Sequence, residues 1–135
     1  MGGHDHEENV ILGTITKNFS FREFRCPCRY PCEVSDGQAI DLGLVHKLQE
    51  IRDRYGAPLV VSSGCRCVAH NGFVGGALAS QHLAAMGCRA ADILVESSID
   101  RAVLVRLALE VDLTVGVSKK FIHLDNRSGQ LLFLY

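Results

Sequence analysis

The sequence predicts an α+β fold: a single small domain with a largely antiparallel sheet and two main helices packed on it. The chain has 135 residues, enough for one domain but too few for two comfortable ones. Two segments, residues 39–55 and 97–110, carry apolar residues at helical spacing. Four or five short apolar segments have the composition of strands, and the last three follow one another directly.

The first part of the chain divides into an arm and the start of the domain. Residues 1–17 begin with polar and acidic residues and are predicted to form a flexible N-terminal arm, so that the domain spans residues 18–135. Ser20 is followed three residues later by Glu23, the spacing of a capping box, which predicts a short helix. Residues 26–32 are expected to form a loop, because two prolines interrupt them.

The clearest helix is predicted at about residues 39–55. Its apolar face consists of Leu44, Val45, Leu48, Ile51 and Tyr55. Gly56 is a natural stop for this helix, and Pro58 lies just beyond it. Residues 59–61 are apolar and mostly β-branched, which predicts a short strand. Residues 62–79 hold four glycines, so we expect a long irregular segment of the kind that is usually functional.

The second half of the chain alternates strands with one helix. Residues 90–95 read as a buried strand that carries Asp92, and residues 97–110 as an amphipathic helix capped at its start by Ser97. Three more strands are predicted, at residues 113–117, 121–125 and 131–135. Residues 126–129 have turn composition and are expected to close a hairpin between the last two strands.

Charge and hydropathy exclude several classes of protein. The formal net charge is −1, which gives no attraction to nucleic acid or to an anionic membrane. No run of residues approaches the roughly 20 apolar positions of a membrane span. The first residues lack the basic start and apolar stretch of a secretory signal. We therefore expect a monomer, cytoplasmic as synthesised, with no nucleic-acid partner and no membrane insertion.

Two histidines and one aspartate indicate a metal site. His82, Asp92 and His123 supply two imidazoles and a carboxylate, which is a ligand set of catalytic zinc. Three protein ligands leave one position open for water, whereas a structural zinc is closed by four. Asp92 stands within an apolar strand, where a carboxylate is costly unless it is paired or bound to a cation. The pattern therefore predicts metal-assisted hydrolysis.

Short motifs from about Asn18 to Arg127 follow one another in the order of a known group of enzymes. They are Asn18-Phe19-Ser20, Glu23-Phe24-Arg25-Cys26, Leu48-Gln49-x-Ile51-Arg52-Asp53-x-Tyr55-Gly56-x-Pro58-Leu59, Ser63-Gly64-x-Arg66-Cys67-x-x-His70-Asn71, Val74-Gly75-Gly76-Ala77, Ser80-Gln81-His82, Ala90-Ala91-Asp92-Ile93 and Phe121-Ile122-His123-Leu124-Asp125. Together they resemble the zinc D-alanyl-D-alanine carboxypeptidases and the related phage endolysin peptidases, a group that includes the hedgehog signalling-domain fold.

The resemblance implies a specific active site. His82, Asp92 and His123 would be the ligands of one catalytic zinc. Arg66 would lie beside the metal and bind the carbonyl oxygen of the substrate as negative charge develops there. Ser80 would form a hydrogen bond near the metal or the substrate.

The activity implied by the resemblance is hydrolysis of amide bonds in peptidoglycan stem peptides or cross-links. The reaction would be of the D,D-carboxypeptidase or endopeptidase type, and the peptidoglycan peptide would be the protein's partner. By analogy with phage lysis enzymes, the protein would act at the cell wall once it is released from the cytoplasm.

The chain departs from the family pattern between its first two predicted ligands. Nine residues separate His82 from Asp92, more than in relatives, and they include a glycine. A bulged loop between the ligands is the expected result. Such a loop either leaves both ligands in place or brings Cys88 close to the zinc.

A second departure concerns the general base. Lys120 and Phe121 occupy the positions where relatives commonly carry an acidic residue or a histidine. The candidate replacements are Asp125 or a carboxylate elsewhere in the chain, and a zinc-bound hydroxide that acts alone is the other alternative. Asp125 would otherwise orient a neighbouring group or simply end a strand at a turn. The alternative function is therefore a catalytically weak or inactive zinc-binding module that binds the cell wall.

Six cysteines raise a separate question. Cys26, Cys28 and Cys32 share one predicted loop, and Cys67 follows the first predicted strand. These four are candidates for a second, structural zinc, which would stabilise a loop with few apolar residues. Buried free thiols or one disulfide are equally simple alternatives. A redox or cysteine-metal protein is a third interpretation, in which function depends on Cys26 and Cys28 and not on the histidines.

Overall fold

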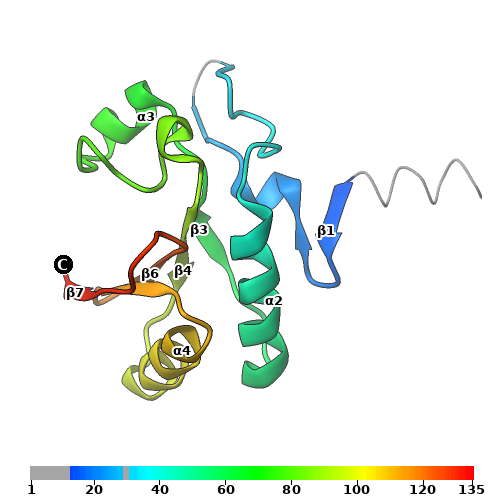
Figure 1. Cartoon of the computed structure of the whole chain (residues 1–135), viewed down its shortest axis with the longest axis vertical. Coiled ribbons are helices and arrows are strands. Elements are labelled where there is room, and N and C mark those ends of the chain that lie inside the picture. The colour runs from blue at the N-terminus through cyan, green and yellow to red at the C-terminus, as the bar shows by residue number, and fades with distance from the viewer. Residues whose placement is uncertain (1–12, 29–30) are drawn as a thin grey trace, which may run out of the picture.

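The computed structural model describes residues 13–28 and 31–135, which form an α+β domain as predicted (Figure 1). The elements, in chain order, are β1 (Thr14–Thr16), β2 (Phe19–Ser20), the 3₁₀ helix η1 (Phe21–Phe24), α2 (Leu42–Tyr55), β3 (Val61–Ser63), α3 (Val68–Phe73), the 3₁₀ helix η2 (Ala84–Met86), β4 (Ala90–Leu94), α4 (Ser98–Glu110), β5 (Thr114–Val117), β6 (Phe121–Asp125) and β7 (Leu132–Leu134).

The N-terminal part forms a small hairpin beside the domain. Residues 1–12 of the predicted arm lie outside the described residues. The last part of the arm contains β1, which pairs with β2. The capping box at η1 is confirmed, because the backbone N–H of Ser20 donates to the Glu23 carboxylate over 2.7 Å. The hairpin contacts α2, so the chain from β1 onward packs against the domain.

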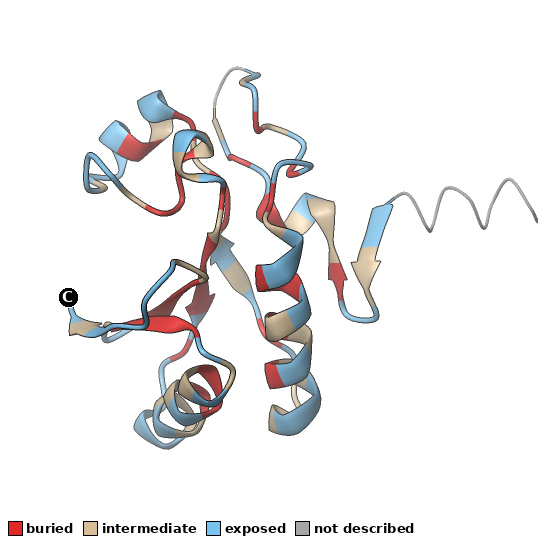
Figure 2. Ribbon diagram, viewed as in Figure 1, coloured by how far each residue is buried: buried red, intermediate tan, exposed pale blue. Residues whose placement is uncertain are grey.

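The two predicted helices are confirmed, and both contribute buried side chains to the same hydrophobic core as the sheet. Asp41 caps α2 by accepting a hydrogen bond from the backbone N–H of Leu44, and Gly56 ends the helix in the left-handed conformation. Ser97 caps α4 in the same way. The helices contact each other, and α4 contacts β5 and β6. Their inner faces and the central strands are the buried parts of the domain (Figure 2).

The main sheet has the strand order β3-β4-β6-β5-β7 and is largely antiparallel, as predicted. The exception is β7, which pairs in parallel with β5. The predicted hairpin between β6 and β7 is therefore wrong. Both edges of β6 are already occupied, by β4 and β5, so the last strand must cross to the free edge of β5.

The segment predicted to be irregular contains a helix. Residues 68–73 form α3, which begins after Cys67 and includes Gly72. Asparagine and glycine have low helix propensity, and this hid the helix from a pattern-based prediction. Across the described part of the chain, no helix combines the length and apolar character needed to cross a membrane.

Candidate functional site

The two central strands bring a carboxylate and an imidazole side by side. Asp92 on β4 is directly opposite His123 on β6, and His82 reaches them from the connection between α3 and β4. The Oδ1 atom of Asp92 lies 3.1 Å from Nε2 of His82 and 3.1 Å from Nδ1 of His123. All three side chains are buried. The structure thus brings together the three predicted metal ligands.

The ring nitrogen of each histidine that faces away from Asp92 is held by a hydrogen-bond acceptor. Nδ1 of His82 donates to the carbonyl oxygen of Gly64 over 2.7 Å, and Nε2 of His123 donates to Oδ2 of Asp125 over 2.7 Å. In the neutral form, each ring therefore turns an unprotonated nitrogen toward Asp92. Nitrogen and carboxylate lone pairs repel one another unless a cation or added protons lie among them. A divalent cation satisfies all three atoms at once, so the donor set fits zinc.

The ionisation of the site follows the same contacts. In the metal-free protein, burial acts to raise the pKa of Asp92. Hydrogen bonds donated to it by protons on the facing nitrogens of His123 and His82 outweigh burial and hold this pKa well below its usual range. Burial acts to lower the pKa of His123, but Asp125 and Asp92 outweigh it and raise this pKa. The site therefore keeps a carboxylate charged in the protein interior and favours positive charge beside it.

Asp125 lies behind His123 and away from Asp92. Its side chain is fully buried, and Arg127 donates to it from Nε over 2.8 Å and from Nη2 over 2.6 Å. Burial acts to raise the pKa of Asp125, but the bonds from Arg127 and His123 lower it to about 2. The position suits a residue that orients His123, and Asp125 is not part of the cavity wall described below.

Arg66 is fixed beside Asp92 by three side chains. Its guanidinium donates to Oγ of Ser63 over 3.0 Å, to Oδ1 of Asn71 over 3.3 Å and to Oδ2 of Asp92 over 3.3 Å. Its backbone N–H donates to the carbonyl oxygen of His82 over 2.8 Å. The Arg66 side chain keeps 12% of its surface exposed, so it is rigid and still accessible from the cavity.

A cavity of about 630 Å³ opens over the triad. His82, Asp92 and His123 contribute to its wall together with Arg66 and Ser80. The Oγ atom of Ser80 accepts a hydrogen bond from the backbone N–H of His82 over 3.2 Å, which leaves the hydroxyl proton available for another acceptor. The cavity is large enough for a peptide-sized group.

Sequence reasoning missed an aromatic wall of this cavity. Asp92, His123, Gly116 and Phe133 are consecutive partners across β4, β6, β5 and β7. Gly116 has no side chain, so the Phe133 ring reaches over it to within 5.6 Å of the His123 ring centre. Tyr135 also lines the cavity. The sequence signal for this wall was the position of Phe133 in the last predicted strand. The hairpin prediction paired that strand with β6, whereas it pairs with β5.

The positions expected to carry a general base contribute no carboxylate. Lys120 is exposed directly before β6, and Phe121 lines the cavity. Among the described residues of the cavity wall, Asp92 is the sole acidic group. Any base other than the predicted ligands must therefore come from outside this wall.

The extra residues between the first two ligands fold away from the triad. They include η2, which ends at Gly87 in the left-handed conformation, and Cys88 follows with a φ of 47°. Cys88 is fully buried, and its thiol is the main cause of a raised pKa of Cys65. Within the described residues, the group that gathers around Asp92 contains His82 and His123 but not Cys88. The alternative that placed Cys88 near the metal is therefore wrong.

A sequence comparison places this geometry in a family. The model of the family described as Peptidase M15 matches residues 17–125, which include every residue of the triad as well as Arg66 and Ser80. A comparison with curated protein sequences finds no match. Because the match covers most of the sequence and the buried triad lies within it, the chain belongs to the peptidase M15 family.

Proposed function

We propose that this protein is a zinc metallopeptidase that hydrolyses amide bonds in peptidoglycan stem peptides or cross-links, as a D,D-carboxypeptidase or an endopeptidase. One observation carries the proposal. Two buried imidazoles each direct a ring nitrogen to within 3.1 Å of one carboxylate oxygen, at the wall of a cavity. Membership of a peptidase family supports the reaction class. The choice of peptidoglycan rests on the resemblance to D-alanyl-D-alanine carboxypeptidases.

The zinc would be held by Nε2 of His82, Nδ1 of His123 and the carboxylate of Asp92. When bound, zinc supplies a Lewis acid that activates water and polarises an amide carbonyl. The protein fixes the two rings through the Gly64 carbonyl and Asp125, so that the ligand atoms are oriented before the metal arrives. Preorganised ligands favour tight and selective binding of the metal.

Arg66 is suited to stabilise the charge that develops on the carbonyl oxygen during hydrolysis. Its guanidinium is held by Ser63, Asn71 and Asp92, and it borders the cavity beside the triad. A fixed cation in a site with little water stabilises an oxyanion by several kcal/mol, on the order of 3. Arginine suits this role because its planar fork bonds its supports and the substrate at the same time.

Two hydroxyl groups are placed to bind the substrate. The Ser80 hydroxyl borders the cavity with its proton free to donate. Burial, followed by the charge of Asp92, raises the pKa of Tyr135 to about 12, so its phenol stays protonated at neutral pH and donates hydrogen bonds. The Phe133 ring adds an apolar surface beside them. The wall thus offers donors for peptide carbonyl groups and an apolar face for a small side chain.

The absence of an unassigned carboxylate among the described residues of the cavity wall favours one other function. A zinc-binding module that binds the cell wall and hydrolyses it slowly or not at all needs the triad and the cavity but no general base. In our proposal Asp125 positions His123 and does not accept the proton of water, because it is buried behind that ring.

The test is zinc-dependent release of new amino groups from purified cell wall. The wild type should release them, a chelator should stop the release, and added zinc should restore it. His123→Ala should abolish hydrolysis and leave the far-ultraviolet circular dichroism spectrum unchanged. His46→Ala is the matched control, because His46 is an exposed histidine on α2 and should keep full activity.

Each outcome separates the two functions. Full activity of a folded His123→Ala variant would exclude the zinc mechanism. Wild-type protein that binds zinc and cell wall but releases no amino groups would favour the binding module over the peptidase.

A further inference from the structure

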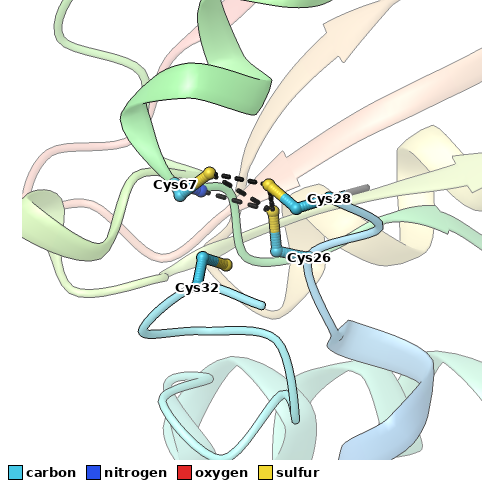
Figure 3. A group of neighbouring side chains, drawn as sticks. All are labelled: Cys26, Cys28, Cys32 and Cys67. Atoms are coloured by element: carbon cyan, nitrogen blue, oxygen red, sulfur yellow. Dashed lines mark hydrogen bonds between the residues drawn. The ribbon is translucent and has the colours of Figure 1, made fainter. Parts of the chain in front are cut away.

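Four cysteines from two distant parts of the chain meet at one point outside the candidate active site. Cys26, Cys28 and Cys32 lie on the connection between η1 and α2, and Cys67 lies directly before α3. Their side chains point toward one another (Figure 3), and their four sulfur atoms all lie within 4.8 Å of each other. All four are free thiols. The cluster plays no part in the proposed hydrolysis.

None of the three measured distances between sulfur atoms is that of a disulfide bond, and the longest equals the spacing expected around a tetrahedral zinc ion. The distances are 2.9 Å for Cys28 and Cys67, 3.4 Å for Cys26 and Cys28, and 3.8 Å for Cys26 and Cys67. Sulfur atoms bound to a tetrahedral zinc at about 2.3 Å lie about 3.8 Å from one another, whereas a disulfide bond is about 2.05 Å long. Four sulfur atoms that gather at one point also exceed what a single disulfide requires.

The sulfur atoms also accept backbone hydrogen bonds, which favour the thiolate form that binds metals. The N–H of Cys67 donates to Sγ of Cys26 over 3.4 Å, and the N–H of His70 donates to Sγ of Cys67 over 3.4 Å. Cys26 and Cys67 are buried, whereas Cys28 and Cys32 are partly exposed beside a cavity of about 650 Å³. A metal ion therefore has a path to the cluster.

The surrounding chain needs a cross-link of this kind. Between η1 and α2, the described residues 25–28 and 31–41 form no helix or strand. Apart from Cys26, the buried apolar side chains in this stretch are those of Val34 and Ile40. The described part of this connection therefore buries little apolar surface with which to fix its own path.

We propose that Cys26, Cys28, Cys32 and Cys67 bind a structural zinc ion that ties the connection between η1 and α2 to the start of α3. Four thiolates close the coordination sphere, so this zinc has no open position for water and takes no part in catalysis. The site also borders the candidate active site along the chain. Arg66 precedes Cys67, and its partner Asn71 lies on α3, so the zinc would fix both ends of that contact.

The test counts zinc per purified chain by elemental analysis in four proteins. The wild type should hold about two zinc ions. The double variant Cys28→Ser/Cys32→Ser should hold one, and so should His82→Ala/His123→Ala. Cys88→Ala is the matched control, because it removes a buried cysteine that belongs to neither group and should leave the count at two.

The outcomes separate this proposal from the proposed function. If the cysteine variant holds as much zinc as the wild type, the structural site is excluded, whatever the histidine variant shows. If the wild type holds one zinc that only the cysteine variant loses, the structural site stands and the catalytic zinc fails.

A second measurement decides the matter if the cysteine variant does not fold. Cobalt is loaded into the His82→Ala/His123→Ala variant, and its absorption spectrum is recorded. Intense thiolate-to-cobalt charge-transfer bands with tetrahedral ligand-field bands support the site. Absence of these bands overturns the proposal. Mass spectrometry that finds a disulfide bond among the four cysteines, with the loss of two hydrogen atoms, also overturns it.

Discussion

The two histidines of the triad turn different ring nitrogens toward Asp92, and a different acceptor fixes each choice. A backbone carbonyl holds His82, whereas the Asp125 carboxylate, itself held by Arg127, holds His123. The sequence identified His82, Asp92 and His123 as a group. It could not show which nitrogen of each ring is free, because that depends on contacts that form only when β6 and the connection after β3 are in place.

Asp125 should make the stability of the metal-free protein depend on pH. Its pKa in the folded state is about 2, below its ordinary value near 4, so its contribution is present above about pH 4 and is lost as the pH falls to about 2. Asp125→Asn should therefore unfold at lower urea than the wild type at pH 5, and the difference should shrink toward pH 2. The measurement is the urea midpoint of each protein at pH 5 and near pH 2, with a chelator present. A difference in urea midpoint that stays constant with pH would contradict the lowered pKa of Asp125. The control is Asp53→Asn, which changes an exposed carboxylate on α2.

Arg66 should be essential as an arginine and not only as a positive charge. Lysine keeps the charge but cannot contact Ser63, Asn71 and Asp92 at once, so the cation would lose its fixed position. We expect Arg66→Lys to lower kcat by roughly 100-fold. The zinc content should stay the same, because Arg66 is not a proposed ligand.

Kinetics of amino-group release and elemental analysis on the same samples check this prediction. Arg106→Lys, at an exposed position on α4, is the control and should behave as the wild type. Equal kcat values for Arg66→Lys and the wild type would show that Arg66 has no role in the reaction.

At the scale of elements, the helices and the antiparallel pairs were predictable, whereas β7 and α3 were not. The capping residues and the apolar spacing that predict α2 and α4 lie within each helical segment or directly before it. The partner of β7 depends on which strand edge is still free after β4, β5 and β6 have paired, and that is a property of the whole sheet. The aromatic wall of the cavity was missed for the same reason.

The connection between α3 and β4 passes so close to Asn71, which holds the Arg66 guanidinium, that position 76 requires a glycine. A Cβ atom at Gly76 would lie 2.1 Å from Oδ1 of Asn71 and 3.0 Å from Nη1 of Arg66. Gly76→Ala should therefore displace Asn71 and the guanidinium that it holds. We expect kcat to fall roughly 10- to 100-fold, because small misplacements of a catalytic group have effects of this size.

Gly72 provides the matched control for this substitution. A Cβ atom there meets no heavy atom within 4 Å, so Gly72→Ala should keep the activity of the wild type. Both variants should keep their zinc. A Gly76→Ala variant as active as Gly72→Ala would show that the contact between the loop and Asn71 is not needed for the reaction.

At the scale of the whole molecule, the proposed zinc ions join parts of the chain that the core holds only weakly. The sheet and its two helices contain most of the buried apolar side chains. Polar contacts also hold the connection that carries His82, among them the hydrogen bonds from Asn71 to the carbonyl oxygen of Ala77 and from Arg89 to Gln81. A metal shared by His82, Asp92 and His123 would fasten this connection to β4 and β6, and the four-cysteine site would do the same for the connection before α2.

Removal of zinc should therefore destabilise the folded protein measurably. A ligand present at about 100 times its dissociation constant stabilises the folded state by about 2.7 kcal/mol, which for a domain of this size corresponds to roughly 10 °C in Tm. Thermal unfolding followed by circular dichroism should show a fall of this order after chelation and recovery with added zinc. Magnesium should not restore Tm, because it prefers oxygen ligands in an octahedral arrangement, whereas the proposed ligands are imidazole nitrogens and thiolate sulfurs apart from the one carboxylate of Asp92. A Tm that chelation leaves unchanged would mean that neither proposed site holds a metal that matters to the fold.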